Sequence, residues 1–291
     1  MIVVFGSINL DLIFSVAALP RAGETVLSRE CRIEPGGKGA NQAAAAARDG
    51  SAVILAGAVG SDALAGLAMA GLERAGVDLS RVRRLDGHTG CAAIAVDVEA
   101  RNSVMVAAGA NRLARAGQIE DALLGPDTTL LLQMETDPEE NAALILRARG
   151  RVARTILNLA PAAPLPPAAL RAVDLLVANE EEGAWLGTRL GTGVNAASLH
   201  QALGVGVVLT LGSQGAEAAT AGGRLRIDGE RVTAVDTTGA GDCFTGVFAA
   251  GLDRGLTIEA AMRRANRAAA LCCTRPGTQG SLPTGAETDA F

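Results

Sequence analysis

Aromatic residues are scarce in this chain of 291 residues, and tyrosine is missing altogether. Phe, Trp and Tyr make up 2% of the sequence, whereas the whole apolar class makes up 49%. A hydrophobic core must therefore be packed mainly from Ala, Leu, Val and Ile. A protein with so few rings is not expected to offer stacking platforms to single-stranded nucleic acid.

Paired cysteines and clustered histidines are missing as well. The five cysteines contain no C-x-x-C pair, and an odd number does not suit a disulfide framework, so we expect a protein of the reducing cytoplasm. The two histidines, His88 and His200, have no cysteine or acidic cluster at metal-ligand spacing. We interpret both as surface or structural residues.

Lysine is almost absent. Lys38 is the only one, and the other 25 basic residues are arginines. The net charge of −5 includes no basic run, which argues against a surface for DNA or membranes. The sequence contains no run of 18 apolar residues, so it predicts no membrane span. The first residues, MIVVFGSINLDLIF, lack a basic segment and predict a buried strand and turn, not a signal peptide.

From residue 50 onward, short apolar runs alternate with helical patterns. Strands are expected at residues 52–60, 128–134, 155–159, 174–178 and 205–211, with helices over 64–75 and from Pro138. This order predicts a mainly parallel sheet covered on both faces. Ligands bind such sheets at the carboxyl ends of the strands. Five polar residues are expected just past strand ends: Asn9, Glu135, Asn179, Thr210 and Asp236.

The segment VDTTGAGDCFTGVFAAGL, residues 235–252, is the most informative part of the chain. A short apolar run ends in Val235, a glycine-rich turn follows, and a helix stripe continues through Phe244, Val247, Phe248, Gly251 and Leu252 to a stop at Gly255. The N-terminus of a helix has free N–H groups and a positive dipole end, so it can hold an anion. Asp242 lies in the first turn, where a carboxylate could deprotonate a hydroxyl.

Two other glycine motifs can be excluded. A dinucleotide fingerprint starting at Gly239 needs glycine at position 244, which is Phe. A Walker A loop ending at Lys38 needs glycine at position 32, which is Arg, and Ser or Thr at position 39, which is Gly. The second glycine segment, GGKGANQAAAAARDG at residues 36–50, again predicts a loop that leads into a helix, with Gly50 as its stop.

These segments resemble the two signature segments of the ribokinase-like sugar kinases, the phosphofructokinase-B family. The resemblance extends nearly from end to end, through GSINLD, PRAGET, LLLQMET, NEEE, LTLGSQG and TRPGTQGS in that order. We therefore expect one domain over residues 1–291, a three-layer α/β/α sandwich with a mainly parallel central sheet. Hairpin-like segments at about 10–33 and 91–108 are expected to form a small β-sheet lid.

The resemblance implies a kinase that phosphorylates the primary hydroxyl of a small sugar with ATP, most simply D-ribose to D-ribose 5-phosphate. Asp242 would be the general base, and the N–H groups of Gly239, Ala240 and Gly241 would form an anion hole for the γ-phosphoryl group. Glu182 would help to organise Mg²⁺ through water.

The resemblance also implies three sets of ligand-binding residues. The sugar would contact Asn9, Asp11, Gly37, Lys38, Asn41, Glu135 and Asp242. ATP would contact Asn179, Thr210, Gly212, Ser213, Gly215, Gly241 and Asn266. A K⁺ activator would be bound by Asp236, Ser281 and the carbonyls of Thr238, Cys272, Arg275 and Gly277.

The family further suggests a homodimer formed through the lid, with no nucleic-acid or membrane partner. Two alternatives stay open: another family activity, such as a fructokinase or a nucleoside kinase, and a sugar- or nucleotide-binding protein without catalysis. A nucleoside kinase would need an apolar or aromatic patch for the base, and Phe5 and Phe14 are the only N-terminal candidates. A protein that only binds its ligand has no need of a base at Asp242.

Overall fold

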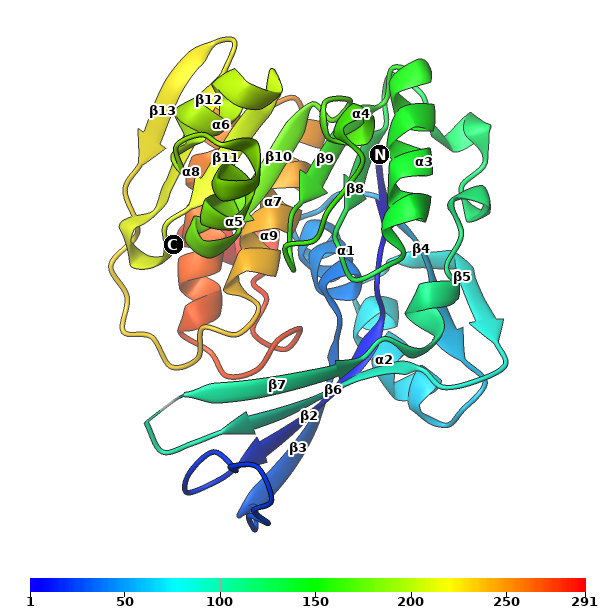
Figure 1. The fold of residues 1–291 in the computed structure, drawn as a ribbon, viewed down its shortest axis with the longest axis vertical. Coiled ribbons are helices and arrows are strands. Elements are labelled where there is room, and N and C mark those ends of the chain that lie inside the picture. The colour runs from blue at the N-terminus through cyan, green and yellow to red at the C-terminus, as the bar shows by residue number, and fades with distance from the viewer. Residues whose placement is uncertain (100) are drawn as a thin grey trace.

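The computed structural model describes residues 1–99 and 101–291. Within them, a central sheet has nine strands in the order β13-β12-β11-β10-β9-β8-β1-β4-β5 (Figure 1). Their bounds are β1 Ile2–Phe5, β4 Val53–Gly60, β5 Asp78–Leu85, β8 Thr129–Leu132, β9 Arg154–Asn158, β10 Leu175–Asn179, β11 Gly206–Thr210, β12 Ala216–Thr220 and β13 Gly223–Ile227. All neighbours are parallel except the antiparallel β11–β12 and β12–β13 pairs.

Both faces of this sheet are buried. Because side chains in a strand alternate between its faces, a single strand can contribute to two hydrophobic cores. In β1, Ile2 and Val4 join one hydrophobic core, and Val3 and Phe5 join the other. The first core packs against α1 Lys38–Arg48, α2 Leu64–Arg74, α7 Ala240–Asp253 and α8 Ile258–Cys273. The second packs against α3 Pro138–Gly150, α4 Pro167–Leu170, α5 Glu180–Leu190 and α6 Ala196–Leu203. The expected three-layer sandwich is confirmed (Figure 1).

The lid is a separate sheet with the order β3-β2-β6-β7, and it projects from one end of the sandwich (Figure 1). Its strands are β2 Asn9–Ser15, β3 Glu30–Gly36, β6 Gly90–Val96 and β7 Asn102–Ala107. The β2–β6 pair is parallel, and the two outer pairs are antiparallel. The small β-sheet lid that was expected is thus present. The hairpin-like segment at about 91–108 includes Ala100, which lies outside the described residues.

The order of the strands in the central sheet reverses beside β1. The chain passes from β1 to β4 on one side, whereas β8 pairs with β1 on the other side and continues to β9. A parallel sheet binds ligands at such a switch point, outside the carboxyl ends of its strands. Ser7 follows β1 and Glu135 follows β8, and the Ser7 hydroxyl donates a 2.6 Å hydrogen bond to Glu135 Oε2. The two strand ends therefore meet as the topology requires.

Some details differ from the sequence expectation. Strand β5 and the β12–β13 hairpin were not predicted, because β5 and β13 are partly exposed and the short β12, AEAAT, lacks a run of large apolar residues. The apolar run before Asp236 forms no strand, and Val235 lies in a loop with 64% of its surface exposed. Asn9 begins β2 and does not follow β1 directly. Asn179 and Thr210 are the last residues of β10 and β11.

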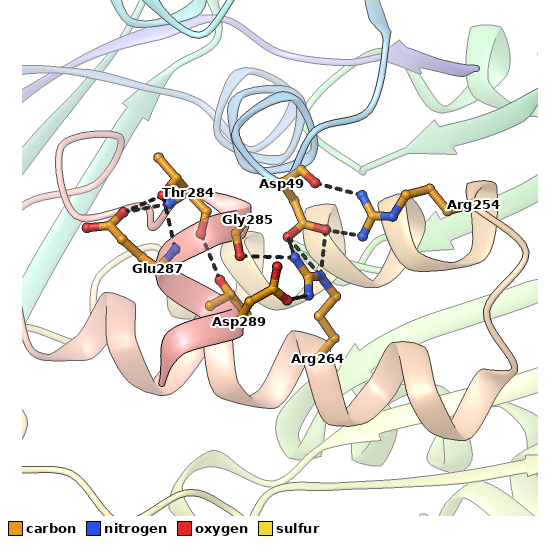
Figure 2. Close-up of polar contacts among 8 residues, drawn as sticks. Asp49, Arg254, Arg264, Thr284, Gly285, Glu287 and Asp289 are labelled. Carbon is orange, nitrogen blue, oxygen red and sulfur yellow. Dashed lines mark hydrogen bonds and ion pairs between the residues drawn. The ribbon is translucent and has the colours of Figure 1, made fainter.

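The C-terminal end of helix α1 is tied to three other helices (Figure 2). The Asp49 side chain is 1% exposed and forms ion pairs with Arg254 after α7, at 2.5 Å, and with Arg264 of α8, at 2.8 Å. Arg264 also pairs with Asp289 of α9, Gly285–Ala290. Thr284 and Glu287 form a capping box at the start of α9. Helix α1 is therefore held at its far end, while its first residues carry side chains of the candidate site.

Candidate active site

Asp242 lies in the first turn of α7, directly after the glycine-rich turn. Gly239 is the N-cap residue and has a φ of 78°, a left-handed conformation that favours glycine. The carboxylate is buried and accepts two hydrogen bonds: from Asn41 Nδ2 to Oδ2 at 2.9 Å and from Gln42 Nε2 to Oδ1 at 2.8 Å. The turn therefore places a buried carboxylate beside the N–H groups at the start of a helix.

A second glycine turn brings α1 to the same place. Gly37 is the N-cap of α1 and has a φ of 89°, and a Cβ atom there would lie 2.7 Å from the backbone nitrogen of Asn9. Only glycine allows this approach between the lid and the helix. Lys38 and Asn41 follow within the first turns of α1. The two glycine segments are about 200 residues apart in sequence, yet Asn41 and Asp242 are in direct contact.

Lys38 lies among carboxylates. The Asp242 carboxylate raises the pKa of the Lys38 ammonium group, burial opposes this shift, and Glu135 and Glu182 add to it. Lys38 also lines a cavity of about 220 Å³, and Asp242 and Glu182 line the same cavity. The other residues that line this cavity are Asn158, Ala160, Val177, Ala178, Asn179, Thr210, Gly239, Gly241 and Thr245. Lys38 is thus a half-buried cation beside the candidate base and the start of α7.

A larger cavity of about 500 Å³ adjoins the first one, because both are lined by Thr210 and Gly241. Most of the residues expected to contact ATP line it, namely Thr210, Gly212, Ser213, Gly215, Gly241 and Asn266. Asn266 is buried on α8, where its amide donates a 2.8 Å hydrogen bond to the carbonyl of Asp228. Asn179 lines the smaller cavity instead. The structure therefore brings the expected ATP set to two adjoining cavities at the ends of β10 and β11.

The residues expected to bind the sugar gather where the lid meets the sandwich. Asn9 and Asp11 are buried in β2, and Asn111 Nδ2 donates a 2.7 Å hydrogen bond to Asn9 Oδ1. Burial, followed by the nearby Glu135 and Asp242 carboxylates, raises the pKa of Asp11 from its ordinary 3.8 to about 7. Buried polar groups of this kind suit a ligand with several hydroxyl groups.

The first turn of α5 is closed by a capping box. The Asn179 side chain accepts from the Glu182 N–H, and Glu182 Oε2 accepts from the Asn179 N–H, both at 2.8 Å. Burial raises the pKa of Glu182. Glu182 therefore has a structural role of its own, with one carboxylate oxygen not used in the box. Among the described residues, no group of three or more His, Cys, Asp and Glu side chains could hold a metal ion.

The residues expected to bind K⁺ lie in the loop before α7 and in the last turn of α8 with the loop that follows it, and hydrogen bonds join the two segments. Asp236 accepts from the Thr238 N–H at 2.9 Å and from the Gly277 N–H at 3.0 Å. Ser281 is fully buried and donates to the Thr278 carbonyl, and its oxygen lies 3.0 Å from Cys272 Sγ. The Cys272 carbonyl accepts from the Arg275 N–H at the end of α8. The expected set is therefore gathered beside the start of α7.

Several polar residues of the site were missed from the sequence. Ser7 contacts Glu135, Asn111 contacts Asn9, and Gln42 contacts Asp242. Gln42 had a detectable signal, because it is the second amide residue at the start of a helix otherwise rich in alanine. Asn111 had none, since it belongs to a short 3₁₀ turn, Gly109–Leu113, that no pattern predicted. His88 is exposed and His200 contacts the Val205 carbonyl, so neither histidine lies in the site.

The chain is similar to known proteins over nearly its whole length. Residues 1–285 match the pfkB family carbohydrate kinase profile. A ribokinase of Haemophilus influenzae is 35% identical, covering 99% of this chain and 97% of that protein. A ribokinase of Bacillus subtilis is 36% identical, covering 99% and 98%. A deoxyribokinase of Salmonella typhimurium is 34% identical, covering 97% and 95%.

Solved structures are similar over the whole chain as well. A ribokinase from Thermotoga maritima superposes with a TM-score of 0.90 at 31% identity, covering 100% of this chain and 98% of that one. An Arabidopsis thaliana ribokinase complexed with ribose and ATP superposes with a TM-score of 0.89 at 30% identity, covering 99% and 97%.

Proposed function

The chain belongs to the pfkB family of carbohydrate kinases, and we propose that it transfers the γ-phosphoryl group of ATP to the primary hydroxyl of D-ribose, giving D-ribose 5-phosphate and ADP. One observation carries the proposal. The Asp242 carboxylate, the N-terminus of α7 and Lys38 line one cavity, between the cavity of the expected ATP residues and the buried polar residues at the base of the lid. A base, an anion site and a cation are thus adjacent.

The proposed reaction is an in-line transfer between two oxygens. Asp242 takes the proton of the primary hydroxyl as that oxygen forms its bond to the γ-phosphorus, and the bond from the γ-phosphorus to the bridging oxygen of ADP breaks. Such a transfer needs alignment and charge stabilisation more than covalent chemistry. The N–H groups of Gly239, Ala240 and Gly241 would stabilise the charge on the transferred group.

Lys38 would contribute on the phosphate side of the site, since it shares the smaller cavity with Gly239, Asp242 and Glu182. Its raised pKa keeps the ammonium group charged at neutral pH. This refines the role expected from the sequence, which was contact with the sugar.

The residues present suit Mg²⁺ bound mainly by ATP. Mg²⁺ keeps several waters and uses few carboxylates together with substrate phosphates. Glu182 lines the phosphate-side cavity and keeps one oxygen outside its capping box. It would hold the ion through water, and the ion would neutralise part of the phosphate charge. Oxygen donors around Asp236 likewise suit a monovalent cation such as K⁺, next to the anion hole.

Ribose is favoured over other substrates by the residues around the lid. The buried Asn9 and Asp11 and the half-buried Glu135 provide acceptors and donors for hydroxyl groups, and a site that pairs each hydroxyl discriminates against analogues that lack one. The similarity to a relative named ribokinase and solved with ribose and ATP supports this choice. Phe5 is fully buried in the core and so cannot contact a nucleobase. Because a deoxyribokinase is similar at 34% identity, 2-deoxyribose is the second candidate.

The lid also supports a homodimer. Its edge strand β7 exposes Val104, Met105 and Val106, with half or more of each residue's surface accessible. An exposed apolar edge strand is a template for pairing with another strand. A second copy of the lid would cover it.

The test is a coupled assay of ADP release with Mg-ATP and K⁺, comparing D-ribose, 2-deoxyribose, D-fructose and adenosine. We expect the highest kcat/KM with D-ribose and a loss of about 10²- to 10⁴-fold in Asp242→Asn. A higher kcat/KM with 2-deoxyribose would transfer the proposal to that sugar. A folded protein that binds ATP and sugar without turnover would instead be a binding protein.

A further inference from the structure

Two consecutive side chains of α1 hold the candidate base. Asn41 donates to one oxygen of Asp242, and Gln42 donates to the other, at 2.9 Å and 2.8 Å. We call Asn41 and Gln42 the amide pair. A carboxylate that accepts one hydrogen bond at each oxygen cannot rotate freely about its last torsion. The amide pair therefore sets the direction in which each oxygen of Asp242 points.

The two members of the amide pair differ in their surroundings. Gln42 is fully buried, and its Nε2 is shared between Asp242 Oδ1 and Asn158 Oδ1, at 2.8 Å and 3.0 Å. Its Oε1 accepts a 2.8 Å hydrogen bond from Gln133 Nε2. Asn41 is slightly exposed, and its Oδ1 accepts a 3.2 Å hydrogen bond from Gln279. Gln42 is thus held by three short bonds, and Asn41 more weakly by two.

The orientation of the Gln42 amide follows from the carboxylate. An ionised carboxylate only accepts hydrogen bonds, so Gln42 must present its nitrogen to Asp242 and its oxygen to Gln133. Gln133 must then present its own nitrogen to Gln42, as the structure has it. This arrangement cannot invert while Asp242 is ionised.

The packing of the two helices makes the contact with Gln42 possible. Gly246 lies one turn after Asp242 on α7, and a Cβ atom there would lie 2.4 Å from the Gln42 carbonyl oxygen and 2.7 Å from Ala45 Cβ. Helices α1 and α7 therefore approach more closely than a larger residue would permit. The close approach brings Gln42 within reach of Asp242, and Gln42 is not among the residues that line the cavity beside Asp242.

We propose that Gln42 is a positioning residue for the phosphoryl transfer, holding Oδ1 of Asp242 so that Oδ2 faces the hydroxyl of the sugar. The inference rests on the proposed function. When the sugar binds, its hydroxyl takes the place of Asn41 at Oδ2, while Gln42 keeps its bond to Oδ1. Gln42 contacts neither substrate. It acts through the alignment of the base, and a misplacement of about 1 Å in such a group can cost about 10²-fold in rate.

The test compares Gln42→Met with Gln133→Met. Methionine has nearly the volume of glutamine and makes no comparable hydrogen bond. Gln133 is also fully buried and is one hydrogen bond further from Asp242, so it is the matched control. We expect kcat of Gln42→Met to fall about 10- to 100-fold, with the KM values for sugar and ATP within about threefold of wild type. Gln133→Met should keep kcat within about threefold and lose less thermal stability than Gln42→Met, because the Gln133 side chain makes one of these hydrogen bonds and the Gln42 side chain makes three.

A second comparison separates positioning from general loosening of the site. Gln42→Met is combined with Asp242→Asn, which removes the base. If Gln42 acts through the base, the double variant should be no slower than Asp242→Asn alone, because residues that act as a unit are not additive. A further loss of tenfold in the double variant would overturn the proposal, as would an unchanged kcat in Gln42→Met. Absence of sugar-dependent turnover in the wild-type protein would refute the proposed function and the positioning role with it.

Discussion

Replacing Asp11 with asparagine should change how the stability of the protein depends on pH. Asp11 is buried in β2 at the base of the lid. Burial, then the carboxylates of Glu135, Asp242 and Glu34, raise its pKa to about 7, and the nearby Lys38 offsets part of this shift. The folded protein therefore keeps a proton on Asp11 up to about neutral pH, whereas the unfolded chain releases it near pH 3.8.

The sign and the magnitude follow from this difference. Between about pH 4 and pH 7 the folded state binds more protons than the unfolded state, so the free energy of unfolding falls as the pH rises. At about 1.4 kcal/mol per pKa unit, the shift from 3.8 to about 7 corresponds to roughly 4 kcal/mol in the free energy of unfolding. The wild-type protein has lost this stability completely above pH 7. Asparagine is neutral at every pH, so Asp11→Asn does not lose this stability as the pH rises.

The assay is urea unfolding followed by circular dichroism between pH 5 and pH 8. We expect the free energy of unfolding of Asp11→Asn to exceed that of the wild type by roughly 2 kcal/mol at pH 5 and by roughly 4 kcal/mol at pH 8. Asp86→Asn changes an exposed carboxylate and is the control, with a pH dependence parallel to wild type. Parallel curves for Asp11→Asn and wild type, or a variant less stable at pH 8, would refute the reasoning.

Three further predictions concern the cation, the core and the lid. Turnover should be several-fold faster in K⁺ than in tetramethylammonium buffer, and equal rates would contradict a cation site at Asp236. Asp49→Asn should lower the free energy of unfolding by about 3 kcal/mol in denaturant titrations, because it leaves Arg264 without its buried partner; the exposed Asp121→Asn should cost less than about 1 kcal/mol. The wild-type protein should sediment as a dimer and Met105→Glu as a monomer, and equal sedimentation of the two would argue against pairing through β7.

The general fold and the family were accessible from the sequence because their signals are local. Continuous apolar runs predicted the parallel strands β4, β8, β9, β10 and β11, and two glycine turns followed by helical patterns predicted α1 and α7. Strands with mixed exposure, such as β5, gave no comparable pattern, since their burial depends on neighbours far away in sequence.

The partners of each site residue depended on the tertiary structure. The sequence placed Asp242 at the start of a helix, but the packing of α1 against α7 across Gly246 brought Gln42 to its second oxygen. The sequence likewise marked Lys38 as unusual, but the convergence of α1, α5 and α7 placed it among the carboxylates of Asp242 and Glu182.

The sequence by itself determined which turns could form, which helix begins beside a carboxylate, and which strands are buried on both faces. These properties follow from local sterics and from the spacing of apolar side chains. Only the tertiary structure decided which amides hold Asp242 and why Asp11 titrates near neutral pH. Hydrogen-bond partners and electrostatic environments are set by distances across the fold, and such distances exist only once the sheet, its helices and the lid have packed together.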